Sequence, residues 1–577
     1  MTDQKNMILA IVLSVLILLG FQFFVEQPRQ VQQRAQQAQD QPAGGTPGQS
    51  TAPSAPGAPG AAGAAPTAAQ SRDAALALTP RVRISTPRIE GSIALKGGRI
   101  DDVVLKDYRV TIDPSSPAIH LLEPTGVQHP YYAEFGWVAA AGAATAVPTP
   151  ETVWTADSDT LAPGKPVTLS WSNGQGLTFQ RVISIDEDYL FTVAQRVVND
   201  GAEAVTLYPY GLISRGGTPE TVDFYILHEG PLGVFDDTLT EIKYGDLVED
   251  GDVTRTATGG WIGITDKYWL AALVPGQGQS WNYTFRHAKR GQDDRYQVDY
   301  LGQAQAVGAG QSATVESRMF AGAKQVKLLD KYEAQHGIDN FDLAIDFGWF
   351  YFLTKPFFYA LTWLHGVLGN FGLAILGLTV IIKLIFFPLA NKSYKSMAKM
   401  KELTPKLQEM REKYGNDRQR LNEEMMALYK REKINPAAGC LPILIQIPVF
   451  FALYKTLFVS IEMRHAPFYG WIKDLSAPDP TSMFNLFGLI PWDPPQFLMI
   501  GAWPLLMGIT MFLQQKLNPQ PTDPVQAKVF MFLPIMFTFL LGHFAAGLVI
   551  YWTWNNLLSI GQQAIIMRRM GIRKALS

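Results

Sequence analysis

A single lysine lies inside a long apolar run in the second half of this 577-residue chain. Residues 357–390 read FFYALTWLHGVLGNFGLAILGLTVIIKLIFFPLA, and Lys383 is the one unambiguous charge among them. A cation buried near mid-membrane costs ~2.5 to 3.5 kcal/mol on insertion scales, so such a residue usually serves a function. We therefore predict that Lys383 is water-exposed and attracts negatively charged groups.

Polar side chains at helical spacing accompany this lysine in the apolar runs. Four of them in the last run fall at i, i+4, i+8 and i+11 and share one helical face. Taken singly, each residue is explained by a hydrogen bond between helices. Taken together with an unpaired lysine, they predict a hydrated cavity within a helix bundle. The candidate residues are Thr379, Gln446, Thr510, Gln514, Tyr551, Asn555, Ser559 and Gln562.

Several other chemistries lack the residues that they need. Cys440 is the only cysteine, which excludes a disulfide framework and cysteine-based zinc or iron–sulfur sites. The chain has no GxxxxGK[ST] motif for an ATP-driven step, and its C-terminal apolar runs contain no Asp or Glu for a proton relay. A net charge of −2 argues against a general nucleic-acid binder.

These candidates require a membrane scaffold. Only 17% of the residues are charged, against ~25% in ordinary soluble domains. Residues 7–25 carry no charge and are long enough to be an uncleaved anchor, and the Ala-, Pro-, Gly- and Gln-rich stretch after them is typical of a disordered linker. We expect an anchor at 1–25, a linker at 26–79, a soluble β domain at 80–340, an amphipathic interfacial helix at 341–356, a second span at 357–390, a cytoplasmic helical hairpin at 391–436, a third span at 437–460, a periplasmic loop at 461–494, a fourth span at 495–515, a cytoplasmic loop at 516–526, a fifth span at 527–543, a sixth span at 544–567 and a short basic tail at 568–577.

The charges of the loops predict the orientation. Residues 391–436 hold 12 Lys/Arg and 7 Asp/Glu, and the tail adds Arg568, Arg569, Arg573 and Lys574. Because basic loops stay in the cytoplasm, both of these segments and both termini are expected there. The β domain is then periplasmic, and the chain is a multi-pass protein of the bacterial inner membrane.

The β domain shows strand-like alternation without helical blocks, which predicts an all-β antiparallel sandwich. Its candidates for catalysis are weak. Asp186, Glu187 and Asp188 fit a hairpin turn better than a pair of glycosidase acids, and His228 and His287 have no metal-binding companion. Four tryptophans could line a sugar-binding face, although core packing explains them better: Trp171, Trp261, Trp269 and Trp281.

The basic loop carries an apolar seam at three- and four-residue spacing, with Thr404 and Pro405 placed as the cap and first residue of a helix. The pattern predicts a helical hairpin. Its seam is either one side of a charged connector or an adaptable surface for varied hydrophobic partners, and the sequence favours neither. The seam residues are Met397, Met400, Leu403, Leu407, Met410, Leu421, Met425 and Leu428.

The strings EEMMALYKREKINPAAGCLPILIQIPVFFALYKTL and GLVIYWTWNNLLSIGQQ resemble the Oxa/Alb/YidC family of membrane insertases, as do PLANKSYKSMAKMKELTPKLQEM and LLMGITMFLQQKLNP. The resemblance covers most of residues 357–570. It implies a five-helix core with a hydrophilic groove, and the large domain is similar to the periplasmic β-supersandwich of Gram-negative members. Lys383 falls on the positively charged position at the centre of that groove. The substrate-contacting positions match Thr379 and Trp552, and Tyr551 is shared.

The resemblance also implies the function. It indicates an insertase and chaperone that has no chemical step, no catalytic residue and no cofactor. The implied partners are nascent membrane proteins, the Sec translocon with its accessory subunits, the translating ribosome and membrane lipids. Two alternatives from other classes are a carrier or channel, and a carbohydrate-active periplasmic enzyme on a membrane tether.

Overall fold

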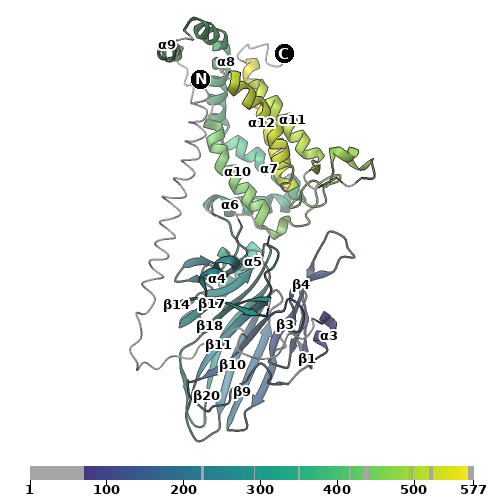
Figure 1. The fold of residues 1–577 in the computed structure, drawn as a ribbon, viewed down its shortest axis with the longest axis vertical. Coiled ribbons are helices and arrows are strands. Elements are labelled where there is room, and N and C mark those ends of the chain that lie inside the picture. The colour runs from purple at the N-terminus through teal and green to yellow at the C-terminus, as the bar shows by residue number, and fades with distance from the viewer. Residues whose placement is uncertain are drawn as a thin grey trace. The chain divides into compact units, whose positions relative to one another are not determined.

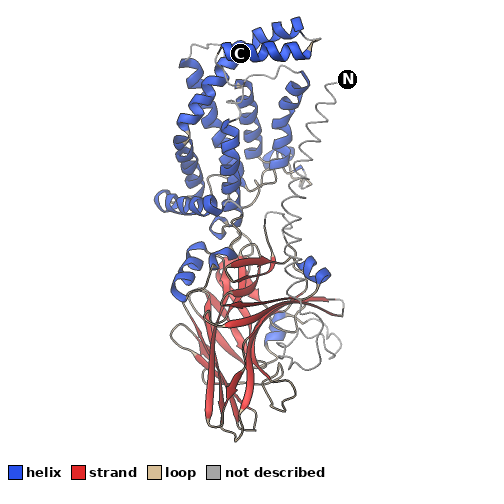
Figure 2. Ribbon diagram, turned by 90° about the vertical axis from the view of Figure 1, so that its left-hand side faces the viewer, coloured by secondary structure: helices blue, strands red, loops and turns tan. Residues whose placement is uncertain are grey.

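The computed structural model describes residues 70–221, 227–291, 293–348, 351–414, 417–432, 441–492, 494–495, 498–518 and 524–569. The expected anchor, most of the linker and the tail beyond residue 569 lie outside these ranges. Within the described ranges, the strands precede the long helices in the chain (Figure 1), and the two kinds of element are segregated (Figure 2).

Two mainly antiparallel sheets form the β domain. In the first, hydrogen-bonded neighbours run β14 (Val253–Thr258), β17 (Ser280–Arg290), β18 (Asp293–Leu301), β11 (Val205–Gly216), β5 (Tyr131–Ala139), β3 (Arg99–Arg109), β2 (Ile89–Ala94), β1 (Arg81–Ser85) and β7 (Thr160–Leu161), with β19 (Gln305–Val307) on β11 and β4 (Ala118–Leu122) on β3. The second runs β13 (Thr238–Glu241), β12 (Gly230–Phe235), β15 (Trp261–Thr265), β16 (Trp269–Val274), β20 (Gln311–Ala323), β10 (Leu190–Asn199), β9 (Leu177–Ile185), β8 (Val167–Ser172) and β6 (Thr155–Ala156). The prediction of a large all-β domain is confirmed.

The core of this domain follows from the alternation in the sequence. Along β9 every second residue is buried, including Phe179 and Ile183, and these side chains join one continuous apolar cluster. Trp261 and Trp281 are almost completely buried in the same cluster, whereas Trp171 and Trp269 are half-buried. Burial of two tryptophans in the core leaves those two rings no sugar-binding face.

The acidic triplet forms a turn between β9 and β10. Asp186 accepts hydrogen bonds from the amides of Asp188 and Leu190, at 2.9 and 3.0 Å, which is an Asx-type turn. Asp188 pairs with Arg88 and Lys331. The Asp186 carboxylate therefore fixes the turn locally, and Asp188 ties it to distant parts of the domain.

The helical part begins after three short helices and one 3-10 turn, which are α3 (Arg72–Leu76), α4 (Tyr244–Asp250), α5 (Val326–His336) and η2 (Phe341–Ala344). It contains α6 (Tyr351–Leu368), α7 (Phe371–Ile385), α8 (Phe387–Tyr414), α9 (Arg418–Arg431), α10 (Leu441–Val459), α11 (Ala502–Leu517), α12 (Pro524–Leu541) and α13 (Ala546–Arg569). The 3-10 turns η4 (Ile461–Met463) and η5 (Met483–Gly488) lie between α10 and α11.

The apolar run 357–390 differs from the single expected span. It contains most of α6, all of α7 and the first residues of α8, and the helix direction changes by 120° between α6 and α7. Gly369 ends α6 with a φ of +68°, which is a left-handed conformation that glycine adopts without a Cβ clash. Asn370 then caps α7 by accepting a hydrogen bond from the amide of Leu373 at 3.1 Å.

The expected interfacial helix at 341–356 also differs. Its first residues form η2, where Phe341 is buried against Trp261, with ring centroids 5.5 Å apart. Ile345 and Phe347 belong to the same β-domain core. These apolar side chains pack into protein, and the following helix α6 begins at Tyr351.

Pro405 does not begin a helix, contrary to the prediction. It lies inside α8, which runs without a break from Phe387 to Tyr414. Proline removes one backbone hydrogen bond from a helix interior. Leu403 and Leu407 on either side of it both pack against Leu428 of α9, so tertiary packing outweighs that local loss.

Within the described ranges, no helix taken alone combines the length and the apolar character needed to cross a bilayer. The bent pair α6 and α7 satisfies both conditions when its two helices are taken together. Shorter apolar helices cover Gln446–Val459 and Ala527–Leu541.

Candidate functional site

A cavity of about 50 Å³ lies among the helices around Lys383. A volume of this size holds a few water molecules. Four helices and the residue between α7 and α8 build its wall, and the wall mixes apolar with polar side chains. The lining residues are Ile382, Lys383, Phe386, Leu389, Ala390, Tyr394, Gln446, Val449, Tyr551 and Asn555.

Lys383 is half-buried and is held by a neutral partner. Its Nζ donates a hydrogen bond to Oγ of Ser559 on α13 at 2.7 Å, and this hydroxyl in turn donates to the carbonyl of Asn555 at 2.8 Å. Among the residues that the structure describes, none offers Lys383 a carboxylate within 4.0 Å. The ammonium therefore retains unneutralised charge beside the cavity.

The other polar groups at the cavity come from three helices. Tyr551 and Asn555 are buried on α13, and the hydroxyl of Tyr551 is hydrogen-bonded to Gln446 on α10. Tyr394 on α8 makes hydrogen-bonding contacts with Ser559 and Gln563. The structure thus brings together five of the predicted residues around one small polar volume.

Tyr394 is a cavity residue that the sequence analysis missed. Tyr394 lies on α8 and Lys383 on α7, so the period of a single helix does not relate them. The two side chains meet through the packing of α7 and α8 around the cavity.

Three predicted groove residues have other surroundings. Thr379 is buried and donates to the carbonyl of Ile375 in its own helix at 2.7 Å. Trp552 packs its ring against Phe450 and Phe537. Gln562 is half-buried on α13 and does not line the cavity.

A second polar contact lies on another side of α13. Asn556 donates its Nδ2 hydrogen to Oγ1 of Thr510 on α11 at 3.2 Å, and Gln563 donates to Asn518 at 3.4 Å. Gln514, on the same helix as Thr510, is half-buried and is not part of the cavity wall. The doubled residues Asn555–Asn556 and Gln562–Gln563 were the signal that α13 is polar on two faces.

The seam of the basic hairpin packs on itself. Leu403 and Leu407 of α8 are buried against Leu428 of α9, and this cluster includes the half-buried Met400, Met410 and Met425. Met397 and Leu421 are half-buried outside the cluster. Most of the seam therefore stabilises the hairpin itself.

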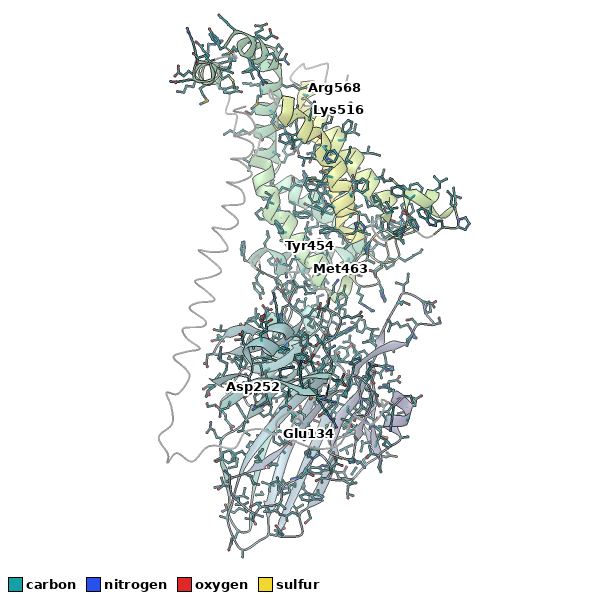
Figure 3. All side chains as sticks on the ribbon, in the orientation of Figure 1. Glu134, Asp252, Tyr454, Met463, Lys516 and Arg568 are labelled. Atoms are coloured by element: carbon teal, nitrogen blue, oxygen red, sulfur yellow. The ribbon has the colours of Figure 1, made fainter. Side chains whose placement is uncertain are left out.

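One end of the helical part gathers positive charge. Ala398, Leu517 and Met567 bring α8, α11 and α13 into one small cluster. Next to these residues lie Lys516 and Arg568, which Figure 3 labels at the same end. Lys401 also reaches this end and donates to the carbonyl of Lys516 at 3.4 Å.

A group of acids near α6 could in principle hold a metal ion: Asp330, Glu333 and Asp342. Lys355 of α6 already donates to Asp330 at 3.0 Å and to Asp342. Tyr351 also donates to Asp342. The group is therefore a charge cluster that fastens α6 to α5 and η2.

The isolated histidines of the β domain have structural partners. Burial lowers the pKa of His228 to about 4, so its ring is neutral at neutral pH and its Nε2 donates to the carbonyl of Pro231 at 3.0 Å. His287 lies 2.9 Å from Asp294. Within the described ranges, the group of side chains that could hold a metal ion consists of Asp330, Glu333 and Asp342, and neither histidine belongs to it.

Comparison with known proteins matches both halves of the chain. Residues 81–360 match the family model described as YidC periplasmic domain, and residues 363–573 match the model described as 60Kd inner membrane protein. A protein of Methylobacterium radiotolerans named membrane protein insertase YidC is 53% identical over 592 residues, covering 99% of this chain and 96% of that protein.

The chain belongs to the YidC family. A YidC relative from Bradyrhizobium diazoefficiens, with the same printed name, is 52% identical and covers 99% of this chain and 97% of its own length. A crystal structure described as an active YidC insertase with its first transmembrane domain resolved matches at 18% identity and a TM-score of 0.34, covering 84% of this chain and 92% of that one. The cavity around Lys383 lies in the part that matches the 60Kd inner membrane protein model of the YidC family.

Proposed function

We propose that this chain inserts newly made proteins into the bacterial inner membrane and assists their folding, without a chemical step. The observation that carries the proposal is Lys383, a half-buried ammonium beside a polar cavity that hydrogen-bonds a neutral serine. Its family supports the proposal, because the relatives carry the name membrane protein insertase.

The chemistry of the cavity suggests how a client would enter. An acidic outer tail of a client is attracted to Lys383, and the hydroxyl and amide groups of Tyr551, Asn555 and Gln446 replace part of its hydration. The polar tail is thereby stabilised part of the way across the bilayer. The apolar portion of the client partitions into lipid along α10 and α12, gaining about 25 cal/mol per Å² of apolar surface removed from water.

The same proposal includes the orientation and the partners. The end that carries Lys401, Lys516 and Arg568 faces the cytoplasm by the positive-inside rule, so the hairpin of α8 and α9 receives the client first. The proposed groove opens to the cytoplasm and to lipid. The proposed partners are the translating ribosome and the Sec translocon. The chain works beside the translocon on some clients and works alone on others.

Photo-crosslinking tests the proposal. A photoreactive phenylalanine analogue replaces Phe386, which lines the cavity, in full-length protein presented with a ribosome-stalled membrane segment. The matched control carries the same analogue at Phe512, an exposed position of α11 outside the cavity wall. We expect an adduct from position 386 that exceeds the one from position 512 several-fold, and equal yields would contradict a client path through the cavity.

A further inference from the structure

A cluster of exposed apolar side chains lies between η4 and α11. We call residues 483–492 the apolar lobe. Its exposed members are Leu486 (53%), Phe487 (51%), Leu489 (83%), Ile490 (44%) and Trp492 (46%). In Figure 1 this segment extends sideways from the helices. No residue from 481 to 492 is charged, so the exposed surface lacks the charged side chains typical of a solvated loop.

The base of the lobe is fixed to the start of α11. Asp479 is buried, and its carboxylate accepts hydrogen bonds from the amide of Trp503 at 2.9 Å, from the amide of Thr481 at 3.0 Å and from the indole of Trp471 at 3.1 Å. Ser482 donates to the carbonyl of Leu498 at 3.0 Å. The lobe is therefore held in a definite position by α11.

Most backbone amides of the lobe donate hydrogen bonds to nearby acceptors. The amide of Phe487 donates to the carbonyl of Ser482 at 2.8 Å, and the amide of Gly488 donates to Oδ1 of Asn485 at 3.0 Å. The amide of Ile490 donates to the carbonyl of Asn485 at 3.0 Å. Such pairing lowers the cost of taking the backbone out of water, because each unsatisfied polar group in an apolar medium costs several kcal/mol.

Two residues of the lobe are held in a strained conformation. Leu486 and Phe487 have φ values of +49° and +58°. For such residues the left-handed region costs on the order of 1 to 3 kcal/mol each, and it persists where the surrounding structure imposes it for a purpose. Here the conformation turns two large apolar side chains outward, away from any protein core.

We propose that the apolar lobe inserts its side chains into the interface of the outer leaflet of the inner membrane. The base of the lobe is fixed to the N-terminal end of α11 through the amide of Trp503, and α11 itself exposes the apolar side chains Leu506 and Ile509. The lobe lies at the opposite end of α11 from Lys516, the basic end assigned to the cytoplasm. The inference rests on the proposed function, which places α11 in the bilayer.

Quenching of an environment-sensitive fluorophore tests this placement. The label is attached to Leu489→Cys in a Cys440→Ser background, which removes the one native cysteine. The full-length protein is reconstituted in vesicles of phosphatidylethanolamine and phosphatidylglycerol. One quencher is iodide in the water phase, and the other is a lipid with a doxyl group close to its headgroup.

Two labelled positions serve as matched controls. Leu78→Cys is an exposed position between α3 and β1 that is expected to stay in water, on the same side of the membrane as the lobe. Ile509→Cys is an exposed position of α11 in lipid. We expect the doxyl lipid to quench the labels at 489 and 509 several-fold more than it quenches the label at 78, and we expect iodide to show the reverse order.

The other outcomes overturn the inference. Iodide quenching at 489 equal to that at 78 places the lobe in water. Protection of 489 from both quenchers shows that protein covers it, either a second copy of this chain or another partner. If the label at 509 also behaves like the one at 78, the placement of α11 in the membrane falls as well, which separates failure of the proposed function from failure of this inference alone.

Discussion

Lys383 on α7 and Ser559 on α13 are joined by a hydrogen bond of 2.7 Å between Nζ and Oγ, although 176 residues separate them in the chain. The serine satisfies one of three ammonium donors and leaves the charge in place. A carboxylate at the same position would have neutralised it. The pair therefore keeps a positive charge available to an arriving anionic group.

Replacing Lys383 tests the role of that charge. Lys383→Met removes the charge at similar length and is expected to slow insertion of acidic-tailed clients about tenfold, since ~1.4 kcal/mol of lost interaction corresponds to that factor. Lys383→Glu is expected to be worse for such clients because it repels them. The measurement is protease protection of newly made clients in vesicles, with Lys383→Arg, which keeps the charge, as the control. Normal insertion by the Glu variant would contradict the proposed attraction.

The charge cluster at α6 predicts a stability effect. Lys355→Met leaves Asp342, which is buried, without its ammonium partner, so the variant is expected to lose ~2 kcal/mol of unfolding free energy. Thermal unfolding of the detergent-solubilised protein measures this loss. The double variant Lys355→Met/Asp342→Asn removes the uncompensated charge and is expected to recover most of it. A double variant no more stable than the single one would show that packing, not charge, fastens α6.

Glu462 predicts a dependence of stability on pH. Burial raises the pKa of this carboxyl to about 7 from an ordinary 4.5, and it accepts a hydrogen bond from the amide of Val326 at the start of α5. Because the folded state holds the proton more tightly than the unfolded state, the native protein loses stability as pH rises from about 4.5 to about 7. Glu462→Gln keeps the shape without this titration.

The difference in stability between the native protein and Glu462→Gln separates the effect of Glu462 from that of His228. The lowered pKa of His228 makes stability rise with pH, which is the opposite slope. We expect the thermal unfolding midpoint of the variant to exceed that of the native protein by an amount that grows between pH 5 and pH 8. The corresponding difference in the free energy of unfolding is on the order of 3 kcal/mol. A difference that stays constant over this range would show that Glu462 does not titrate there.

Helices α11 and α12 pack closely at Gly508, because this residue has no side chain. A Cβ at this position would lie 2.1 Å from Oγ1 of Thr538, which donates to the carbonyl of Pro534 at 2.8 Å. Small residues permit such close helix contacts in membranes. We expect Gly508→Ala to lower the unfolding midpoint, and the double variant Gly508→Ala/Thr538→Ala to restore part of it. A double variant as unstable as Gly508→Ala would place the clash elsewhere.

The sequence predicted the polar companions of Lys383 where helical periodicity carries the information. Tyr551, Asn555 and Ser559 share a face because they are one turn apart, and the structure places all three near the lysine. Alternation of apolar residues likewise indicated the β domain. Both signals arise because the period of a helix or strand determines which side chains point the same way.

Features set by tertiary contacts were not predictable from these local signals. The bend within residues 357–390 is different, because its signal is local: Gly369 ends α6 and Asn370 caps α7, although hydropathy is continuous through both. Pro405 reads locally as a helix start, whereas α8 continues through it and Leu403 and Leu407 pack with Leu428 of α9. Thr379 has the right spacing from Lys383, yet its hydroxyl bonds its own helix.

Helix α13 supplies both the partner of Lys383 and two polar groups of the cavity wall, and it follows α7, α8 and α10 in the chain. Ribosomes deliver the N-terminal end first, so α7 and its lysine are made long before the helix that completes the site. The cavity around Lys383 therefore remains open on one side until α13 has been made. The order of translation thus delays the assembly of the proposed site until α13 reaches the membrane.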